Sequence, residues 1–504
     1  MDIDVVASPP TGVEADVLAF PVPDPVVLPP SGLEIDRLVE GRLAHLIEDG
    51  ELKGSRGHLT LLHSDGRLKA HRVAAAGVGE QDETDADSLR TAAAAVARRA
   101  SEIGARTVAW VLEENGLPVS ASEQARAVVD GIALGPYYAG RWKTTQDDGE
   151  ERTRELDRLI LCGPGAEAVA DDARRANVIA RWTNKCRDLV NAPANELTPE
   201  SLTEWAQSTA SDLPTLRFES MNAEEIRAAG MGALTAVGQG STNPPHLITI
   251  QYEPDGARDD FVLGLVGKAI TFDAGGLSLK PADKLDEMKS DMGGGAAVLA
   301  ATAAIAELGI PLRVMTVVPA SENMPGGRAF RPGDIITSLN GKTIEVTNTD
   351  AEGRLILADA LWHARQNGAT HMVDLATLTG AMVVAMGDFY AGVFGNDEDW
   401  VEKVRAAGEA VGDHVWTWPL HETYRRHLHS TFADMKNSSE HRQGAPIYAA
   451  RFLQEFVGDG PWAHLDIAGT AYLERGRGDY YASPGATGYG VRLLTELAQR
   501  LAGG

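Results

Sequence analysis

The sequence predicts an α/β fold with two domains, each built on a parallel or mixed β-sheet sandwiched by helices. Apolar runs typical of strands alternate with amphipathic runs typical of helices along most of the chain. The 504 residues exceed what one hydrophobic core usually holds. With 43% hydrophobic and 23% charged residues, the composition is that of a globular protein and excludes wholesale disorder, a coiled coil or collagen-like repeats.

The first predicted domain covers residues 1–165. Strands separated by helical patterns indicate an α/β arrangement there. Titratable groups do not cluster in this part, so we expect a role in assembly or regulation rather than in chemistry. The predicted strands are residues 17–22, 58–64, 73–79, 107–113 and 159–163, and the predicted helices are 88–104 and 122–134.

A connecting helix is predicted within residues 166–190, where an amphipathic stretch runs into a segment punctuated by proline and asparagine. Residues 191–504 then form the predicted C-terminal domain. Its strands are apolar almost throughout, as expected for a sheet covered by helices on both faces. These strands are predicted at residues 247–253, 261–272, 312–320, 343–349 and 371–377.

Charge and segment composition restrict the partners and the location. The net charge of −26 argues against nucleic acid as the principal partner, because an acidic surface repels phosphates. The start of the chain lacks the pattern of a secretory signal, and the most apolar stretch, residues 293–310, is too short for a membrane span. Cys162 and Cys186 are too few for a disulfide framework. We therefore expect a cytoplasmic protein with reduced thiols and no membrane partner.

The first segment that indicates chemistry runs from Val266 to Ala300. Lys268 interrupts an apolar strand, Asp273 ends it before a Gly-Gly turn, and Asp291 opens an alanine-rich helix. The carboxyl ends of strands and the starts of helices are where open α/β sheets build their sites. These three side chains are therefore candidate site residues.

The second segment runs from Glu345 to Ala364. Asp350, Glu352 and Arg354 alternate along a piece that we expect to be extended, with a helix from about Leu355. Alternate residues of an extended piece point to the same side. The three side chains are therefore expected to face one site.

Three aspartates and a glutamate that converge in a buried place cannot all stay ionised without compensation. A pair of divalent cations about 3.5 to 4 Å apart would supply it, with carboxylates bridging the two ions. Lys268 would join as a ligand if the metal held it as the neutral amine. The plainer alternative is that Lys268 and Asp273 form a buried ion pair and that residues 350–354 are a charged turn.

Beyond this chemistry, the motifs resemble the leucyl (cytosol) aminopeptidase family of dinuclear-metal exopeptidases. The resemblance is carried by NTDAEGRL (348–355) and by VGKxxTFDxGGxSxKP (266–281). It covers nearly all of the chain from about residue 180 onward. It continues through ENMPGGRAFRPGDI (322–335), MVDLATLTGA (372–381), WAHLDIAGTA (462–471) and GATGYGVRLL (485–494).

The resemblance implies two divalent metal ions per subunit, zinc with manganese or magnesium possible at the exchangeable position. One ion would be held by Lys268, Asp273, Asp291 and Glu352. The other would be held by Asp273, Asp350 and Glu352, with the backbone carbonyl of Asp350 assisting. Lys280 would polarise the scissile carbonyl, and Arg354 would hold a bicarbonate ion that acts as the general base. All seven positions are intact in this sequence.

The same resemblance implies a homohexameric aminopeptidase that releases N-terminal residues from peptides with a free N-terminus. Leucine and other apolar residues would be preferred broadly, since one methylene in an apolar pocket discriminates by only about 1 to 3 kcal/mol. The implied pocket is apolar and adaptable. It is formed by Met288, Thr377, Leu378, Gly380 and Ala468.

Three departures from the family pattern qualify this picture. Ala274 and Gly293 are small residues beside the predicted metals and should tune activity only, whereas residues 437–453 differ in a way that bears on substrate preference. His464 and Asp466 are expected to orient a loop.

The alternatives to an aminopeptidase are another two-metal hydrolase, such as a phosphoesterase, and a DNA-binding or regulatory protein.

Overall fold

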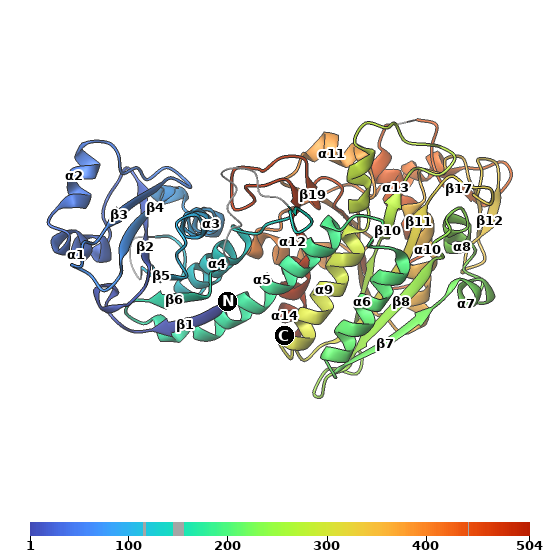
Figure 1. Ribbon diagram of the computed structural model, residues 1–504. Helices are drawn as coiled ribbons and strands as arrows, with labels where there is room; N and C mark the ends of the chain where they lie inside the picture. The colour runs from blue at the N-terminus through green and yellow to red at the C-terminus, as the bar shows by residue number, and fades with distance from the viewer. Residues whose placement is uncertain (114–116, 145–155, 442, 504) are drawn as a thin grey trace. The chain divides into compact units, whose positions relative to one another are not determined.

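The computed structural model describes residues 1–113, 117–144, 156–441 and 443–503, which form two compact units (Figure 1). The first unit is Met1–Asn184 with Arg475–Pro484, and the second is Lys185–Glu474 with Gly485–Gly504. The division between them falls inside helix α5 (Ala170–Asn191). No sequence pattern indicated that residues 475–484 pack with the first unit.

The described part of the first unit contains a six-stranded sheet in the order β1-β6-β5-β2-β4-β3. All strand pairs are parallel except β3 with β4. The five strands predicted here are confirmed, and β1 is an addition. The strands are β1 (Asp2–Val6), β2 (Val17–Asp24), β3 (Leu59–His63), β4 (Arg72–Glu80), β5 (Thr107–Val111) and β6 (Arg158–Cys162).

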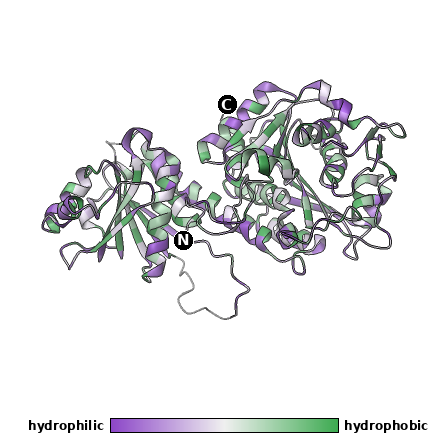
Figure 2. Cartoon of the chain, turned by 90° about the horizontal axis from the view of Figure 1, so that it is seen from above, coloured by the Kyte–Doolittle hydropathy of each residue, from purple (hydrophilic) through white to green (hydrophobic). Residues whose placement is uncertain are grey.

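Helices cover both faces of this sheet because alternate residues of β2 enter two separate cores. Val17 and Ala19 pack in a cluster with α3 (Ala86–Glu102) and α4 (Ala121–Leu134). Leu18 and Phe20 pack with α1 (Pro30–Leu38) and α2 (Arg42–Glu48). Hydrophobic residues accordingly line the strands, and hydrophilic residues are frequent on the outer helices (Figure 2).

The second unit is built on a nine-stranded mixed sheet in its described part, ordered β16-β15-β18-β14-β9-β11-β8-β7, with β10 also paired to β11. The central strands β18, β14, β9 and β11 are parallel, so their carboxyl ends meet at one edge. The strands are β7 (Leu216–Met221), β8 (His246–Tyr252), β9 (Val262–Gly267), β10 (Ala269–Asp273), β11 (Arg313–Asn323), β14 (His371–Ala376), β15 (Ala391–Gly395), β16 (Val415–Thr417) and β18 (Trp462–Asp466).

Helices α8 (Gly232–Gly238), α10 (Gly353–Gln366) and α13 (Ala445–Gln454) share one core with alternate residues of the central strands. Helix α9 (Gly293–Glu307) packs on β9, β11 and β14 and also against α14 (Val491–Ala502). Short strands form two further small sheets. One contains β12 (Ile335–Thr337), β13 (Thr343–Glu345) and β17 (Met435–Lys436), and the other contains β19 (Tyr472–Leu473) and β20 (Gly485–Ala486). The helices are α6 (Pro199–Asp212), α7 (Ala223–Ala228), α8 (Gly232–Gly238), α9 (Gly293–Glu307), α10 (Gly353–Gln366), α11 (Gly380–Met386), α12 (Glu398–Val411), α13 (Ala445–Gln454) and α14 (Val491–Ala502).

The α/β fold class is confirmed, with two local differences from the predicted strands. The run 261–272 divides into β9 and β10 at Lys268, and the run 343–349 keeps only the three residues of β13. None of the helices that the structure describes combines the length and hydrophobicity needed to span a bilayer. Cys162 and Cys186 are both buried free thiols.

Candidate metal centre

Five charged side chains from four chain segments meet at the carboxyl edge of the central strands in the second unit. Lys268 lies between β9 and β10, and Asp273 is the last residue of β10. Asp291 lies between the 3-10 helix Leu285–Ser290 and α9. Asp350 and Glu352 directly precede α10. This edge is where the parallel arrangement predicts a site.

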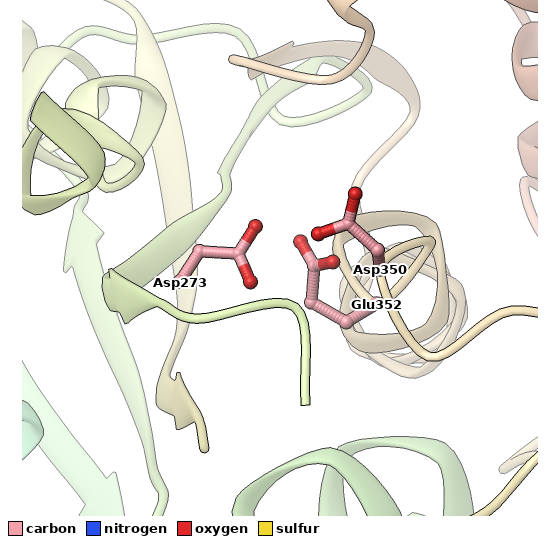
Figure 3. A group of neighbouring side chains, drawn as sticks. All are labelled: Asp273, Asp350 and Glu352. Atoms are coloured by element: carbon pink, nitrogen blue, oxygen red, sulfur yellow. The ribbon is translucent and has the colours of Figure 1, made fainter. Parts of the chain in front are cut away.

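Three of the carboxylates point toward one another (Figure 3). One oxygen each from Asp273, Asp350 and Glu352 lies within 4.8 Å of the other two. Asp273 and Glu352 are 2% and 1% exposed, whereas the Asp350 side chain keeps 32% exposure. Oxygen donors gathered at this spacing suit a divalent cation.

Two lysines insert between the carboxylates. Lys268 Nζ lies 2.9 Å from Asp291 Oδ2 and 2.9 Å from Glu352 Oε1. Lys280 Nζ lies 2.9 Å from Asp273 Oδ2 and 2.6 Å from Asp350 Oδ1. Lys268 therefore pairs with Asp291 and Glu352. The sequence left open an ion pair between Lys268 and Asp273, and that pair is not among the described contacts.

Burial and neighbouring charges shift the pKa values of several groups in the cluster. Burial raises the pKa of Asp291 to about 8, although Lys268 opposes the shift. Burial and the charges of Asp273 and Glu352 raise the pKa of Asp350 to about 6. Burial alone would lower the pKa of Lys268, but the adjoining carboxylates hold it above its ordinary value. A bound cation would stabilise the ionised carboxylates, and ligation by Lys268 would require the loss of its proton.

The predicted extended alternation of Asp350, Glu352 and Arg354 is wrong. Asp350 lies in a turn, Glu352 already has helical backbone angles (φ −78°, ψ −35°), and Arg354 belongs to α10. Gly353 allows the close approach of the helix to the site, since a Cβ atom there would lie 2.7 Å from Lys268 Nζ. The carboxylates converge through a turn and a helix start.

Arg354 is 5% exposed and lines the cavity that opens on the charged cluster. Its Nη1 donates a hydrogen bond to the Asn437 carbonyl oxygen at 2.9 Å, and its Nε has no hydrogen-bond partner among the described residues. The guanidinium stands 5.6 Å from the Tyr448 ring centre. A buried guanidinium with an unused donor is suited to bind an anion.

Two fully buried asparagines, which sequence reasoning missed, hold the site segments. Asn437 Nδ2 donates to the Asn348 carbonyl oxygen at 2.7 Å, and its Oδ1 accepts from the Thr347 N–H at 2.9 Å. Asn323, the last residue of β11, donates toward Asp273. Asn437 begins the segment whose departure was expected to affect substrate preference, yet its contacts are to the metal-site segment.

A cavity of about 230 Å³ opens on these groups. Its charged lining comprises the predicted metal ligands, Lys280 and Arg354. All five predicted pocket residues line it as well: Met288, Thr377, Leu378, Gly380 and Ala468. Val383, Ser290 and Tyr472 are lining residues that sequence did not indicate.

The loop after β14 joins the apolar lining to the charged cluster. Thr377 donates from Oγ1 to Asp291 Oδ1 at 2.7 Å and accepts from Lys268 Nζ at its carbonyl oxygen at 3.0 Å. Asp466 accepts from the Leu378 N–H at 3.2 Å and from Thr379 Oγ1 at 2.6 Å. Asp466 thus orients this loop, as expected, whereas fully buried His464 pairs with Asp374.

Comparisons with known proteins agree with this geometry. Residues 184–495 match the catalytic domain of the cytosol aminopeptidase family, and residues 17–146 match the N-terminal domain of that family. A "Probable cytosol aminopeptidase" of Solibacter usitatus is 43% identical over 498 residues, covering 99% of both chains. Another, from Roseiflexus castenholzii, is 42% identical, covering 98% of both.

Two solved structures are similar over nearly the whole chain. A mutant of tomato leucine aminopeptidase has a TM-score of 0.88 at 32% identity and covers 99% of this chain and 96% of its own. The bottromycin maturation enzyme BotP in complex with Mn has a TM-score of 0.84 at 36% identity, covering 97% and 100%. The chain therefore belongs to the cytosol (leucyl) aminopeptidase family of metal-dependent exopeptidases.

Proposed function

We propose that this aminopeptidase works with two divalent cations held by Lys268, Asp273, Asp291, Asp350 and Glu352. The observation that carries the proposal is the approach of the Asp273, Asp350 and Glu352 oxygens to within 4.8 Å of one another. The raised pKa values of Asp291 and Asp350 support it, because these carboxylates favour added positive charge. When bound, two such cations lower the pKa of water from 15.7 toward about 7 and so make a nucleophile available at neutral pH.

By resemblance, Lys268, Asp273, Asp291 and Glu352 would hold one cation. Asp273, Glu352 and Asp350, the last also through its backbone carbonyl, would hold the other. The greater exposure of Asp350 supports an exchangeable second position. Zinc is the proposed metal, with manganese or magnesium at the exchangeable position. The similarity to BotP, whose structure is in complex with Mn, supports manganese as one of the metals.

Lys280 and Arg354 are the proposed catalytic residues. Lys280 lines the cavity, and its ammonium would supply positive charge where the oxyanion of the scissile carbonyl develops. The neighbouring carboxylates raise its pKa above the ordinary value despite burial, so the ammonium persists at neutral pH. Arg354 would hold bicarbonate as the general base, which its unused Nε–H supports.

A free α-amine on the substrate is the expected requirement for activity. The polar end of the cavity carries four carboxylates, and an acylated nitrogen would bring neither a positive charge nor an available lone pair to them. We expect leucine arylamide to be hydrolysed with added Mn²⁺, and its N-acetyl analogue to be hydrolysed at least about 10³-fold more slowly. Release of the arylamine chromophore measures both.

The same assay tests metal dependence and the rival reaction. Prior removal of metal with a chelator should abolish turnover, and Mn²⁺ or Zn²⁺ should restore it. Turnover of the acetylated substrate would contradict the proposed exopeptidase site. Turnover of a phosphate ester without turnover of the arylamide would favour a two-metal phosphoesterase.

Side-chain preference should depend on Met288, a flexible apolar residue in the cavity lining. Replacing Met288 with alanine is expected to lower kcat/KM for leucine arylamide by about 10-fold, since each lost methylene contact is worth about 1 to 3 kcal/mol. Alanine arylamide, whose side chain ends short of this contact, is the internal control. An equal loss for both substrates would place Met288 outside the side-chain pocket.

The remaining parts of the proposal rest on the resemblance. We propose a homohexamer in the cytoplasm, acting on peptides, with the first unit serving assembly or regulation and residues 166–190 connecting it to the catalytic part. The names of the cytosolic relatives support the location. The net charge of −26 opposes a DNA-binding role.

A further inference from the structure

Asn323 is a fully buried amide aimed at two of the metal-site carboxylates. Its Nδ2 lies 2.8 Å from Asp273 Oδ1, 3.4 Å from Glu352 Oε2 and 3.0 Å from the Thr349 carbonyl oxygen. It is absent from the lining of the cavity, so it does not reach a substrate. Asn323 therefore contacts the site only through its carboxylates and the adjoining backbone.

The orientation of this amide is determined by its surroundings. Its Oδ1 has no hydrogen-bond partner in the described part of the chain. Turning that oxygen toward Asp273 and Glu352 would set three acceptors against one another, so the N–H groups must face the carboxylates. The Gly276 turn packs closely behind, since a Cβ atom there would lie 2.8 Å from Asn323 Oδ1.

The amide distinguishes the two oxygens of each carboxylate. In Asp273, Oδ1 accepts from Asn323 Nδ2 and from the Gly275 N–H at 2.9 Å, while Oδ2 faces Lys280. In Glu352, Oε2 faces Asn323, while Oε1 faces Lys268. One amide group thus contacts both carboxylates that would bridge the cations, with the shorter hydrogen bond to Asp273.

We propose that Asn323 is a positioning residue that presents Asp273 and Glu352 to the two cations in one orientation. The inference rests on the two-metal function proposed above. Hydrogen bonds to ligating carboxylates hold them in place, and removal of such partners typically costs about 10-fold to 100-fold in metal affinity or activity. Removing the amide also takes a donor from Asp273 Oδ1 and from the Thr349 carbonyl oxygen, so the folding of each variant has to be measured beside its metal binding.

Two variants separate positioning from folding. Asn323→Ala removes the amide, and Asn323→Leu removes its donors while keeping most of its volume. The matched control is Asn340→Ala, because Asn340 also makes three hydrogen bonds, to Glu455, Ser338 and Lys342, but none to the metal-site carboxylates. Thermal unfolding in a chelator shows which metal-free variants fold.

Mn²⁺ binding to each chelator-treated full-length protein is then titrated by calorimetry, and kcat and KM for leucine arylamide are measured at saturating Mn²⁺. We expect both Asn323 variants to bind Mn²⁺ about 10-fold to 100-fold more weakly and to lose kcat with little change in KM. Asn340→Ala should match the parent. Unchanged Mn²⁺ affinity in folded Asn323→Leu would overturn the proposal. Fewer than two Mn²⁺ ions bound by the parent would instead overturn the two-metal function, and the positioning role with it.

Discussion

Replacing Asp350 with alanine is expected to lower kcat/KM for leucine arylamide by at least about 10³-fold. Asp350 offers an oxygen to the three-carboxylate cluster and pairs with Lys280 at 2.6 Å. The variant therefore loses a proposed ligand of the exchangeable cation and releases the proposed oxyanion-stabilising lysine. Asp350 is also the most exposed of the clustered carboxylates, so the fold should tolerate the change better than it would a change at Asp273 or Glu352.

The measurement is initial-rate hydrolysis at saturating Mn²⁺, with thermal unfolding to verify the fold. Asp283→Ala is the matched control, because it removes the same charge from an exposed residue near the site in sequence. The control should keep the activity of the parent. If Asp350→Ala loses less than about 10-fold while folded, Asp350 makes no essential contribution to transition-state stabilisation.

Replacing Asp359 with alanine is expected to have the largest effect on stability. Asp359 is fully buried in α10. Its Oδ2 accepts hydrogen bonds from the N–H groups of Ala233 and Leu234 at 3.0 and 2.9 Å, at the start of α8, and its Oδ1 accepts from the Leu339 N–H at 2.7 Å. The variant leaves three backbone donors without an acceptor, so the free energy of unfolding should fall by roughly 3 to 5 kcal/mol.

Urea unfolding followed by circular dichroism measures this loss as a shift of the midpoint. Asp359→Asn retains one acceptor oxygen and should fall between the parent and the alanine variant. Asp260→Ala, which breaks an exposed pair with Arg258, should leave the midpoint unchanged. A midpoint for Asp359→Ala equal to that of the parent would show that water or another acceptor replaces the carboxylate.

Charged residues that interrupt apolar runs made much of the site predictable. Lys268 and Asp273 stand out because a buried strand rarely contains an ionised side chain. The alternating charges of Asp350, Glu352 and Arg354 indicated the second cluster, although the extended geometry expected for them is wrong, and the family resemblance added their roles. Gly353 was part of the octapeptide beginning at Asn348. The structure alone shows why a glycine stands there: the Lys268 side chain approaches too closely for a Cβ atom.

Other features depend on contacts between distant residues. Asn323 and Asn437 are uncharged, and the contacts of Asn437 with the site segment span more than 80 residues, so no local pattern identifies them. Those contacts stabilise the turn at Asp350 in place of the expected extended piece. Strand β1 was missed because its acidic residues at positions 2 and 4 hid a run that pairs with β6.

The double attachment of Thr377 constrains how this enzyme could acquire a new substrate range. Its hydroxyl and carbonyl groups hold Asp291 and Lys268, while the next residue, Leu378, lines the proposed side-chain pocket. Any substitution that shifts this loop to admit a different side chain also shifts two groups of the charged cluster. Laboratory evolution for altered specificity should therefore favour replacements at Met288, which lies in the 3-10 helix Leu285–Ser290, over replacements at residues 377–380.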